Sequence, residues 1–342
     1  MDWFEKITGF RERNYAETRA RLEVADGRLR SLVNGRSYAV GELDLMPLQR
    51  LRELGRVAAV GFATARPGGM KVSIVEGGVR EMHQAPENSG ALFQVASQFN
   101  LLEMPSPSVT PEHGVTAYQH DKTQGPACAM AAGAATIYRN YFAPVGDQQG
   151  QTSAIQIDAL APIGEALGIS LARPASDLWS MCNGYAICTG AGLDAISAHL
   201  AAQTPAEKDA LREKLCIGVQ TNVEVTDGAH APPAHVSQAF CSALPVAYGS
   251  VPAKHWKAFA TLILEASYEA TMWAALLNAQ RTGSNVVLLT RVGGGVFGND
   301  AKWIDDAMRR ALALFRHLGL DVRLVSYRSP SADQLRLIRD FS

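Results

Sequence analysis

The chain of 342 residues has little of what usually assigns a protein to a class at first sight. Its formal net charge of −1 provides no broad basic surface for nucleic acid and no electrostatic membrane anchor. No apolar run approaches the length of a membrane span, and no internal repeat or low-complexity tract is present. A globular protein follows. A single ligand that carries a diphosphate needs only a local site and stays compatible with this charge.

Cysteine is scarce too, and its five positions are odd in number, widely spaced and set in mostly apolar surroundings. This pattern is typical of reduced core thiols and not of a disulfide framework. No CxxC spacing occurs and the eight histidines are scattered, so we expect neither a metal site nor a cofactor. The first ten residues, MDWFEKITGF, include acidic residues and no apolar core of a signal peptide. We therefore expect a cytoplasmic protein.

The order of patterns along the chain predicts one large domain with two additions. Residues 1–56 form an expected N-terminal extension of helix and hairpin, with Asn34-Gly35 as the hairpin turn and a short helix at 46–54. Residues 57–342 form the main α/β domain, beginning with a strand at 57–63. A mainly helical insertion is predicted at about 143–213, with helices at 154–167, 178–188, 191–202 and after Thr204-Pro205.

Apolar, β-branched runs and helical periodicity alternate through the main domain. The runs predict strands at 70–75, 92–96, 216–226, 236–248, 286–290 and 321–327. The periodic segments predict helices at 127–142, 256–278 and 300–317. Strands that alternate with helices favour an α/β fold.

The most informative stretch is NVVLLTRVGGGVFGND, residues 285–300. Its loop, Gly293 to Gly298, joins a buried strand to a helix that Asn299 or Asp300 can cap. Glycines allow positive φ and close ligand approach, and free N–H groups near a helix start bind phosphate. A tight turn without ligand is the alternative. Phe297 favours the binding site, because an exposed aromatic ring in such a loop can wall a sugar or a base.

Polar residues follow the predicted strand 92–96, and Asn100 is a candidate ligand there because open α/β sheets bind beyond the carboxyl ends of their strands. A second polar loop, Asp121 to Pro126, precedes a helix that starts with small residues. Small residues at a helix start have two explanations: they allow the helix to pack closely against its neighbours, or they leave room for a ligand beside the polar loop. Asp121 and Gln124 are either catalytic or part of a solvated loop that caps the helix.

From Met70 to Tyr327, this order of elements resembles the macro domain, an ADP-ribose-binding α/β/α fold. The family loop of glycine, small residue, glycine, Val or Ile, Tyr or Phe, and glycine matches Gly293, Gly294, Gly295, Val296, Phe297 and Gly298. LFQVASQFN takes the place of the family's VNAAN segment, with Asn100 as the ribose-binding asparagine. The resemblance implies a three-layer α/β/α macro-domain-like mixed sheet, here with a helical insertion as in larger glycohydrolases.

Three family features are missing. No glycine-rich first loop follows Asn100, no glycine triplet ends in paired glutamates, and no clear adenine-contacting aspartate follows the strand at 70–75. Asp121 to Pro126 is the expected replacement for the first loop, since it also precedes a helix and contains Gly125.

The resemblance implies binding of ADP-ribose or an ADP-ribosylated protein, and hydrolysis of an ADP-ribosyl bond. In this hypothesis Asn100 orients the ribose, Asp121 is the acid/base or water-positioning group, and Gln124 contacts ribose or water. Gly125, the loop Gly293–Gly298, Asn299 and Tyr327 would bind ligand, with Tyr327 near adenine. The alternatives are a non-catalytic ADP-ribose reader and another nucleotide-binding protein of Rossmann type, in which the glycine loop would follow an early strand instead of a late one.

Overall fold

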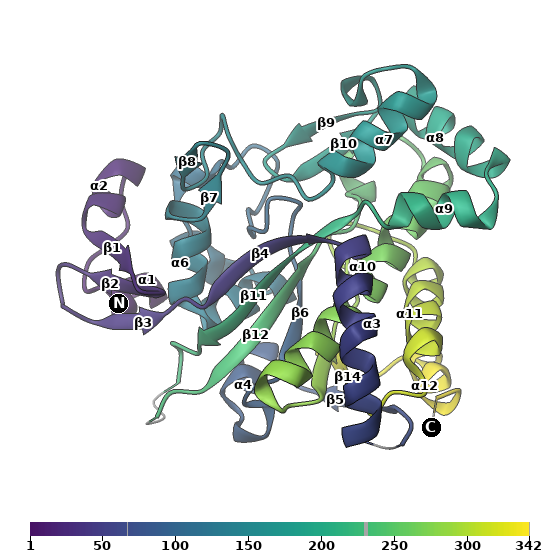
Figure 1. The fold of residues 1–342 in the computed structure, drawn as a ribbon. Coiled ribbons are helices and arrows are strands. Elements are labelled where there is room, and N and C mark those ends of the chain that lie inside the picture. Colours follow the sequence, from purple (N-terminus) through teal and green to yellow (C-terminus); the bar gives the residue numbers. More distant parts are fainter. Residues whose placement is uncertain (67, 229–231, 342) are drawn as a thin grey trace.

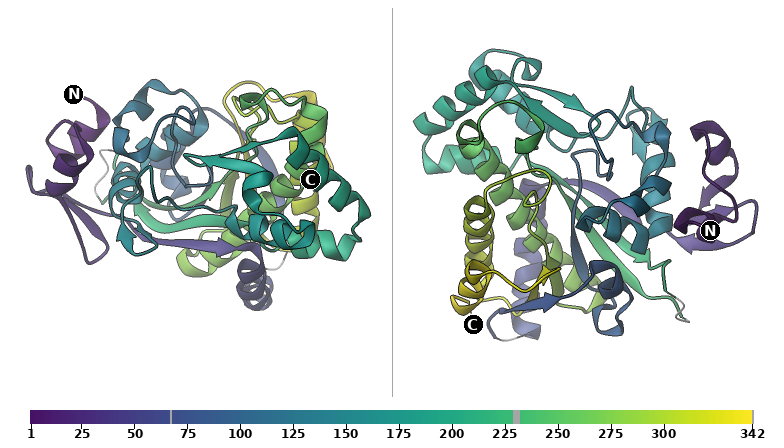
Figure 2. Two further views of the ribbon diagram at one scale, coloured as in Figure 1. Left: turned by 90° about the horizontal axis from the view of Figure 1, so that it is seen from above. Right: turned by 180° about the vertical axis from the view of Figure 1, so that it is seen from behind.

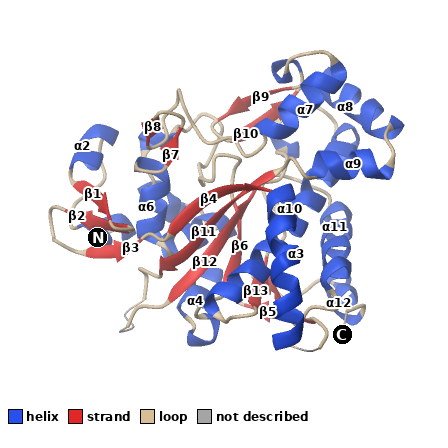
Figure 3. Cartoon of the chain, viewed as in Figure 1, coloured by secondary structure: helices blue, strands red, loops and turns tan. Residues whose placement is uncertain are grey.

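A computed structural model describes residues 1–66, 68–228 and 232–341. A seven-stranded mixed sheet runs through the molecule with helices on both of its faces (Figures 1 and 3). The three-layer α/β/α arrangement expected from the sequence is therefore observed. Along the described part of the chain, no helix is both long and apolar enough to cross a membrane.

The sheet has the strand order β4-β11-β12-β6-β13-β14-β5. β12, β6, β13, β14 and β5 are mutually parallel, whereas β11 runs antiparallel to both of its neighbours. The carboxyl ends of the parallel strands therefore meet at one edge of the sheet. The strands are β4 (Glu42–Pro47), β5 (Lys71–Glu76), β6 (Leu92–Ala96), β11 (Cys216–Glu224), β12 (His235–Cys241), β13 (Val286–Leu289) and β14 (Asp321–Ser326).

Both faces of the central strands are apolar because both are covered. In β13, Val287 and Leu289 belong to one hydrophobic core cluster while Val286 and Leu288 belong to a second cluster on the opposite face. The first face is covered by α10 (Ala253–Thr282), flanked by α3 (Leu48–Ala65) and α11 (Ala301–Phe315), as Figure 2 shows from two further sides. The tail helix α12 (Ala332–Arg339) packs on α11.

The opposite face is covered by α4 (Val79–Gln84), α5 (Gln124–Ala131) and α6 (Gly133–Tyr141). One helix was expected at 127–142, but the chain breaks it at Ala132, whose φ of −109° and ψ of 54° are not helical. The small side chains around the break let the two helices pack closely on the sheet, as one of the sequence-based alternatives proposed.

The N-terminal segment lies to one side of the sheet, at the left in Figure 1. It contains α1 (Trp3–Thr8), α2 (Tyr15–Ala20), β1 (Leu22–Ala25), β2 (Arg28–Ser31) and β3 (Ser37–Ala39). The Glu12 carboxylate accepts hydrogen bonds from the N–H groups of Val115 and Thr116, and so fastens this segment to the loop before Asp121.

Three predictions for this region differ from the structure. The tight two-residue turn is Asp26-Gly27, which has positive φ at both residues, whereas Asn34-Gly35 belongs to a longer connection. Residues 57–63 are helical within α3 and not a strand. Moreover, β4 pairs with β11 inside the main sheet, so the part outside the sheet ends before Glu42 and not at residue 56.

The insertion is mainly helical and also contains two short hairpins. Its helices are α7 (Ala161–Leu171), α8 (Gly190–Ala202) and α9 (Pro205–Arg212), and short strands β7 (Pro144–Val145) and β8 (Gln148–Gln149) precede them. The helix expected at 178–188 is wrong: β9 (Trp179–Cys182) and β10 (Tyr185–Cys188) form a hairpin there. Its turn, Asn183-Gly184, has positive φ at both positions, as a two-residue hairpin requires.

Candidate active site

A cavity of about 340 Å³ opens at the carboxyl ends of the parallel strands. Its wall contains residues that follow β6, β12, β13 and β14, together with the start of α5 and part of the hairpin β9–β10. This is the edge at which open α/β sheets bind ligands. The structure brings the glycine loop, the segment after β6 and the polar loop 121–126 together here, although they are far apart in the sequence.

The glycine loop has a defined conformation. Gly293 and Gly298 have φ of 75° and 71°, in the left-handed region that favours glycine. A Cβ at Gly298 would lie 2.8 Å from the Cβ of Ala247, and a Cβ at Gly293 would lie 2.7 Å from Nδ2 of Asn299. Both glycines are therefore required by backbone conformation and by close packing.

Buried side chains fasten both ends of this loop. Tyr268 of α10 donates to the carbonyl of Thr290 at 2.7 Å and accepts from the N–H of Val292 at 3.0 Å. Oε1 of Gln94 accepts from the N–H of Thr290 at 3.2 Å. The Asn299 side chain donates to the carbonyl of Leu244 at 2.8 Å. Asn299, expected as a ligand residue, thus holds the loop in place, and it is absent from the cavity wall.

Three consecutive N–H groups of the loop are free. Those of Gly295, Val296 and Phe297 have no acceptor among the residues that the structure describes. All three residues line the cavity, and a Cβ added at Gly295 would meet nothing within 4 Å. Consecutive unpaired amides beside a cavity suit an anion such as phosphate.

The aromatic ring of this loop is less exposed than expected. Phe297 is only 8% exposed, because its ring packs against Tyr185 of β10 and Tyr248, with centroid distances of 5.3 and 5.5 Å. All three rings still border the cavity. They form a fixed apolar wall there, and Tyr185 is contributed by the insertion.

The segment after β6 folds back on itself. Gln98 exchanges two hydrogen bonds with the backbone of Met104, and Leu101 has a φ of 63°, which is uncommon for a residue other than glycine. Asn100 is fully buried; its amide donates to Gln156 at 2.8 Å and accepts from the N–H of Leu102 at 3.1 Å. Asn100 is therefore not among the residues that line the cavity, and its contacts stabilise the turn.

This turn presents Glu103, which the sequence analysis did not select. The residue is 3% exposed and lines the cavity, and its Oε1 has no hydrogen-bond partner among the described residues. Burial raises the pKa of the Glu103 carboxyl well above its ordinary value; the Arg139 guanidinium acts in the opposite direction and the nearby Asp121 adds to the increase. A carboxyl group that keeps its proton near neutral pH can act as a general acid.

The loop 121–126 borders the cavity as expected. Asp121 accepts a hydrogen bond from the N–H of Thr123 at 2.8 Å, and Lys122 beside it is exposed, without an ion-pair partner in the described ranges. Gly125 packs directly against Glu103: a Cβ at this position would overlap with Glu103 Oε2 and with the carbonyl of Ala96. Gly125 thus provides the space in which the Glu103 carboxyl lies.

Gln124 lines the cavity, but its amide is bound to the strand edge. Its Oε1 accepts from the N–H of Ala96 and its Nε2 donates to the carbonyl of Gln94, both at 2.9 Å. The side chain therefore replaces a missing strand partner for β6 and fixes the start of α5. Tyr327, just after β14, is 81% exposed and stands at the cavity wall, in a position to contact a bound planar group.

The described residues contain no group of three or more His, Cys, Asp and Glu side chains that could hold a metal ion. The cavity lining itself supplies amides, a carboxylic acid, hydroxyls and aromatic rings.

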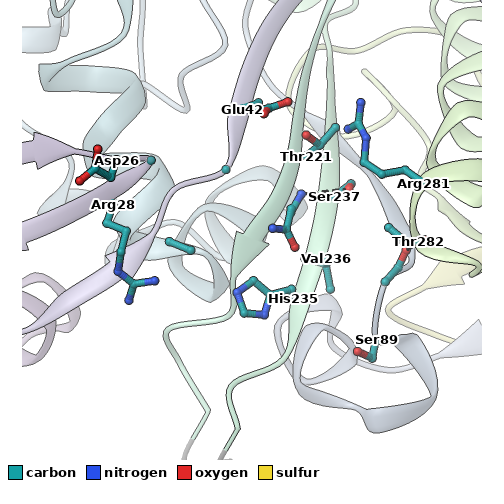
Figure 4. A pocket seen from close by; sticks show the side chains of 15 residues that line it. Asp26, Arg28, Glu42, Ser89, Thr221, His235, Val236, Ser237, Arg281 and Thr282 are labelled. Carbon is teal, nitrogen blue, oxygen red and sulfur yellow. Dashed lines mark hydrogen bonds between the residues drawn. The ribbon is translucent and has the colours of Figure 1, made fainter.

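A second hollow of about 700 Å³ lies at the opposite, amino ends of β6 and β12 (Figure 4). Side chains of both charges line it, including Asp26, Glu42 and Arg281. Arg28, also at its wall, already donates to Ser37. This mixed lining favours no single class of ligand.

No protein-family model and no curated protein matches this chain in sequence. Several solved structures are similar to it. The poly(ADP-ribose) glycohydrolase from Thermomonospora curvata is 14% identical, with 96% of this chain and 97% of that chain covered and a TM-score of 0.44. The same protein bound to the inhibitor ADP-HPD is 13% identical, with 96% of each chain covered and a TM-score of 0.41.

The poly(ADP-ribose) glycohydrolase from Deinococcus radiodurans in complex with ADP-ribose is 11% identical, with 87% of this chain and 93% of that chain covered and a TM-score of 0.43. At these identities and scores the likeness does not establish an activity. An activity for this chain has to rest on the cavity itself.

Sequence reasoning missed Glu103 and Tyr185 for different reasons. Glu103 is the one charged residue in the mostly apolar segment Phe99 to Pro105, and this isolated carboxyl was a signal that could have identified it. Tyr185 became recognisable only with the hairpin, because helical periodicity assigned its segment to the wrong type of element.

Proposed function

We propose that this protein binds ADP-ribose in the cavity and hydrolyses an ADP-ribosyl bond on a modified macromolecule. One observation carries the proposal: the same cavity joins the three free amides of Gly295, Val296 and Phe297 to the buried carboxyl of Glu103. The amides suit a diphosphate. The carboxyl suits protonation of a glycosidic leaving group.

In this proposal the ligand spans the cavity from the glycine loop to the turn after β6. The loop amides bind the diphosphate, the wall of Tyr185, Tyr248 and Phe297 packs beside the distal ribose, and Tyr327 stacks with adenine. Lys122 supplies a positive charge at the cavity wall that favours an anionic ligand. The anomeric carbon would then lie toward Glu103 and Asp121.

The chemistry follows from the two carboxyl groups. Glu103, kept protonated by burial, gives its proton to the oxygen or nitrogen of the acceptor as the glycosidic bond breaks. Water attacks the developing oxocarbenium ion and passes its proton to a carboxylate, for which Asp121 is placed, more exposed to solvent than Glu103. The products are free ADP-ribose and the unmodified acceptor.

Asn100 and Gln124 have supporting roles in this account. Asn100 stabilises the turn that presents Glu103, and Gln124 fixes the start of α5, where Gly125 makes room for the carboxyl. In the structure the Asn100 amide contacts Gln156 and the N–H of Leu102, and the Gln124 amide contacts the backbone of β6. Contacts of either residue with ribose or water stay a prediction.

Two other functions stay compatible with parts of the site. A reader of ADP-ribose would need the loop amides but not the buried acid. A dinucleotide enzyme is suggested by Gly293, Gly295 and Gly298, which have the spacing of the GxGxxG fingerprint. In that fingerprint the diphosphate lies at the helix start, whereas here the Asp300 carboxylate already caps α11 by accepting from the N–H of Lys302 at 2.8 Å. This negative charge disfavours a diphosphate at the helix end.

Incubation with an ADP-ribosylated protein tests the proposal. The intact protein should release free ADP-ribose, and Glu103→Gln should release it at least about 100-fold more slowly, the usual worth of a general acid. The matched control is Glu112→Gln, a partly buried glutamate bound to Ser153 and absent from the cavity wall, which should keep full activity. Binding without release by the intact protein would favour the reader instead.

A further inference from the structure

Arg139 of α6 is a buried cation without a carboxylate partner. It has no exposed surface, and its hydrogen bonds go to the carbonyl of Leu101 at 3.1 Å, Oε1 of Gln220 at 2.9 Å and Oγ1 of Thr136 at 3.1 Å. Its guanidinium carbon lies 4.0 Å from the centroid of the Phe240 ring. In the described part of the chain all of its contacts are neutral, so its charge is not balanced by a salt bridge.

Such a charge is costly to keep. A buried ion without an opposite partner loses its hydration, and a neutral donor could serve most of the same acceptors. Burial lowers the pKa of Arg139 to about 10, while the Glu103 carboxylate raises it. A function beyond packing would account for the retained charge, and Glu103 is the ionisable group whose charge acts most strongly on Arg139.

Two features connect Arg139 to Glu103. The first is geometric: Arg139 holds the carbonyl of Leu101, the residue with φ of 63° that turns the chain two positions before Glu103. The second is electrostatic: Arg139 is the cation that acts on the Glu103 carboxyl, and it opposes burial and the negative charge of Asp121.

Apart from Arg139 and the exposed Lys122, the titratable groups around Glu103 are neutral or acidic. The Tyr118 hydroxyl accepts a hydrogen bond from the N–H of Glu103 at 3.0 Å. Burial raises the pKa of Tyr118. Burial likewise raises the pKa of the Cys128 thiol on α5 and of Tyr185 on β10. None of the three carries charge near neutral pH, and Lys122 at the cavity wall is exposed to solvent.

We propose that Arg139 is a positioning residue for Glu103, which fixes the turn at Leu101 and supplies the positive charge that lets the Glu103 carboxyl release and regain a proton. This inference rests on the proposed hydrolase function. In that reaction the Glu103 proton moves to the leaving group as the glycosidic bond breaks, the attacking water gives its proton to Asp121, and Glu103 regains a proton from solvent before the next turnover. Without Arg139 the intermediate Glu103 carboxylate would be buried beside Asp121 with no opposing charge.

The test measures Glu103 without any ligand. Proteins labelled with ¹³C in the glutamate carboxyl are titrated by NMR, and Glu103→Gln assigns the resonance by its loss. Arg139→Met should move the titration midpoint of Glu103 to higher pH. Arg139→Lys, which keeps the charge but cannot reach all three acceptors, should return the midpoint toward that of the unmodified protein. Thr136→Val removes one hydrogen bond of Arg139 and not its charge, and should leave the midpoint unchanged.

Hydrolysis rates across the same pH range give the second readout. Arg139→Met should lower kcat at least about tenfold and shift the pH profile in the same direction as the NMR midpoint, with KM for the substrate little changed. If Arg139→Met fails to fold, Arg139→Gln, which keeps a hydrogen-bond donor and removes the charge, takes its place in the comparison with Arg139→Lys. An unchanged midpoint in a folded Arg139→Met variant, or a midpoint in Arg139→Lys as high as in Arg139→Met, would overturn the inference.

The two proposals fail in different ways. A shifted Glu103 midpoint without any hydrolysis by the intact protein would reject the hydrolase function and keep the coupling between Arg139 and Glu103. Hydrolysis that needs Glu103 but shows no effect of Arg139 on its titration would keep the function and reject the positioning role.

Discussion

The Glu103 carboxyl lies directly against the Cα of Gly125, in space that any larger residue at position 125 would occupy. Gly125→Ala should therefore displace Glu103 and cost about 1–3 kcal/mol of unfolding free energy, as overpacking in a filled core does. Hydrolysis should fall by more than the loss of folded protein explains. Gly61→Ala is the matched control, since a Cβ at that exposed helical position meets nothing within 4 Å. It should leave activity unchanged and not reduce stability.

Glu103→Gln should make the protein more stable at neutral pH while it slows the proposed hydrolysis. Burial raises the folded-state pKa of Glu103. The contribution of Glu103 to the free energy of unfolding is therefore greatest below the ordinary glutamate pKa of ~4.3 and decreases as the pH rises toward the raised folded-state pKa. A glutamine carries no such dependence. Urea unfolding of both proteins between about pH 4.5 and pH 8 should show a difference that grows with pH in favour of the variant. A difference independent of pH would count against a protonated Glu103.

The glycines of the loop should separate folding from binding. Gly293→Ala places a side chain at positive φ and against Asn299, and should cost about 1–3 kcal/mol. Gly295→Ala meets open space and should unfold like the unmodified protein, yet weaken ADP-ribose binding about tenfold because its methyl group lies at the free amides. Denaturant unfolding and calorimetry measure the two effects. If Gly295→Ala and the unmodified protein bound ADP-ribose equally well, the loop amides would not be part of the binding site.

A charge network away from the cavity should govern stability in acid. Arg52 of α3 binds the buried Glu269 of α10 at 2.6 Å, and Arg310 of α11 binds the same carboxylate at 2.7 Å. Burial acts to raise the pKa of Glu269, but these two guanidinium groups lower it below the ordinary value. The stabilisation is thus present above the ordinary glutamate pKa and is lost as pH falls through the lowered folded-state value.

Arg52→Met should accordingly cost about 3–5 kcal/mol at neutral pH, since it leaves Glu269 with one cation of two. The loss should be smaller at pH 3 than at pH 7 in urea unfolding. A cost below about 1 kcal/mol at neutral pH, the value of a surface ion pair, would contradict this account.

Local patterns were sufficient for much of the sheet. Residues 92–96 were predicted as a strand and form β6, and the run at 286–290 contains β13, because buried parallel strands leave short apolar runs bounded by turn residues. The position of the glycine loop at the carboxyl end of a strand also followed from the sequence. The sequence therefore predicted the side of the cavity that the glycine loop forms.

The rest depends on contacts that a local pattern does not contain. The pairing of β4 with β11 joins distant parts of the chain, so residues 42–47 could not be placed in the sheet. Glu103 is presented by a turn that Arg139 and Gly125 hold from two other helices. Asn183-Gly184 is a local hairpin signal, but the apolar residues on both sides of it also fit a helix. In so short a segment, periodicity alone does not distinguish a helix from a hairpin.

The most direct test of the central claim is a calorimetric titration of the intact protein with ADP-ribose. The account predicts saturable binding of one ligand per chain, weakened by Gly295→Ala and retained by Glu103→Gln. No detectable heat up to high-micromolar ligand would contradict an ADP-ribose site in this cavity.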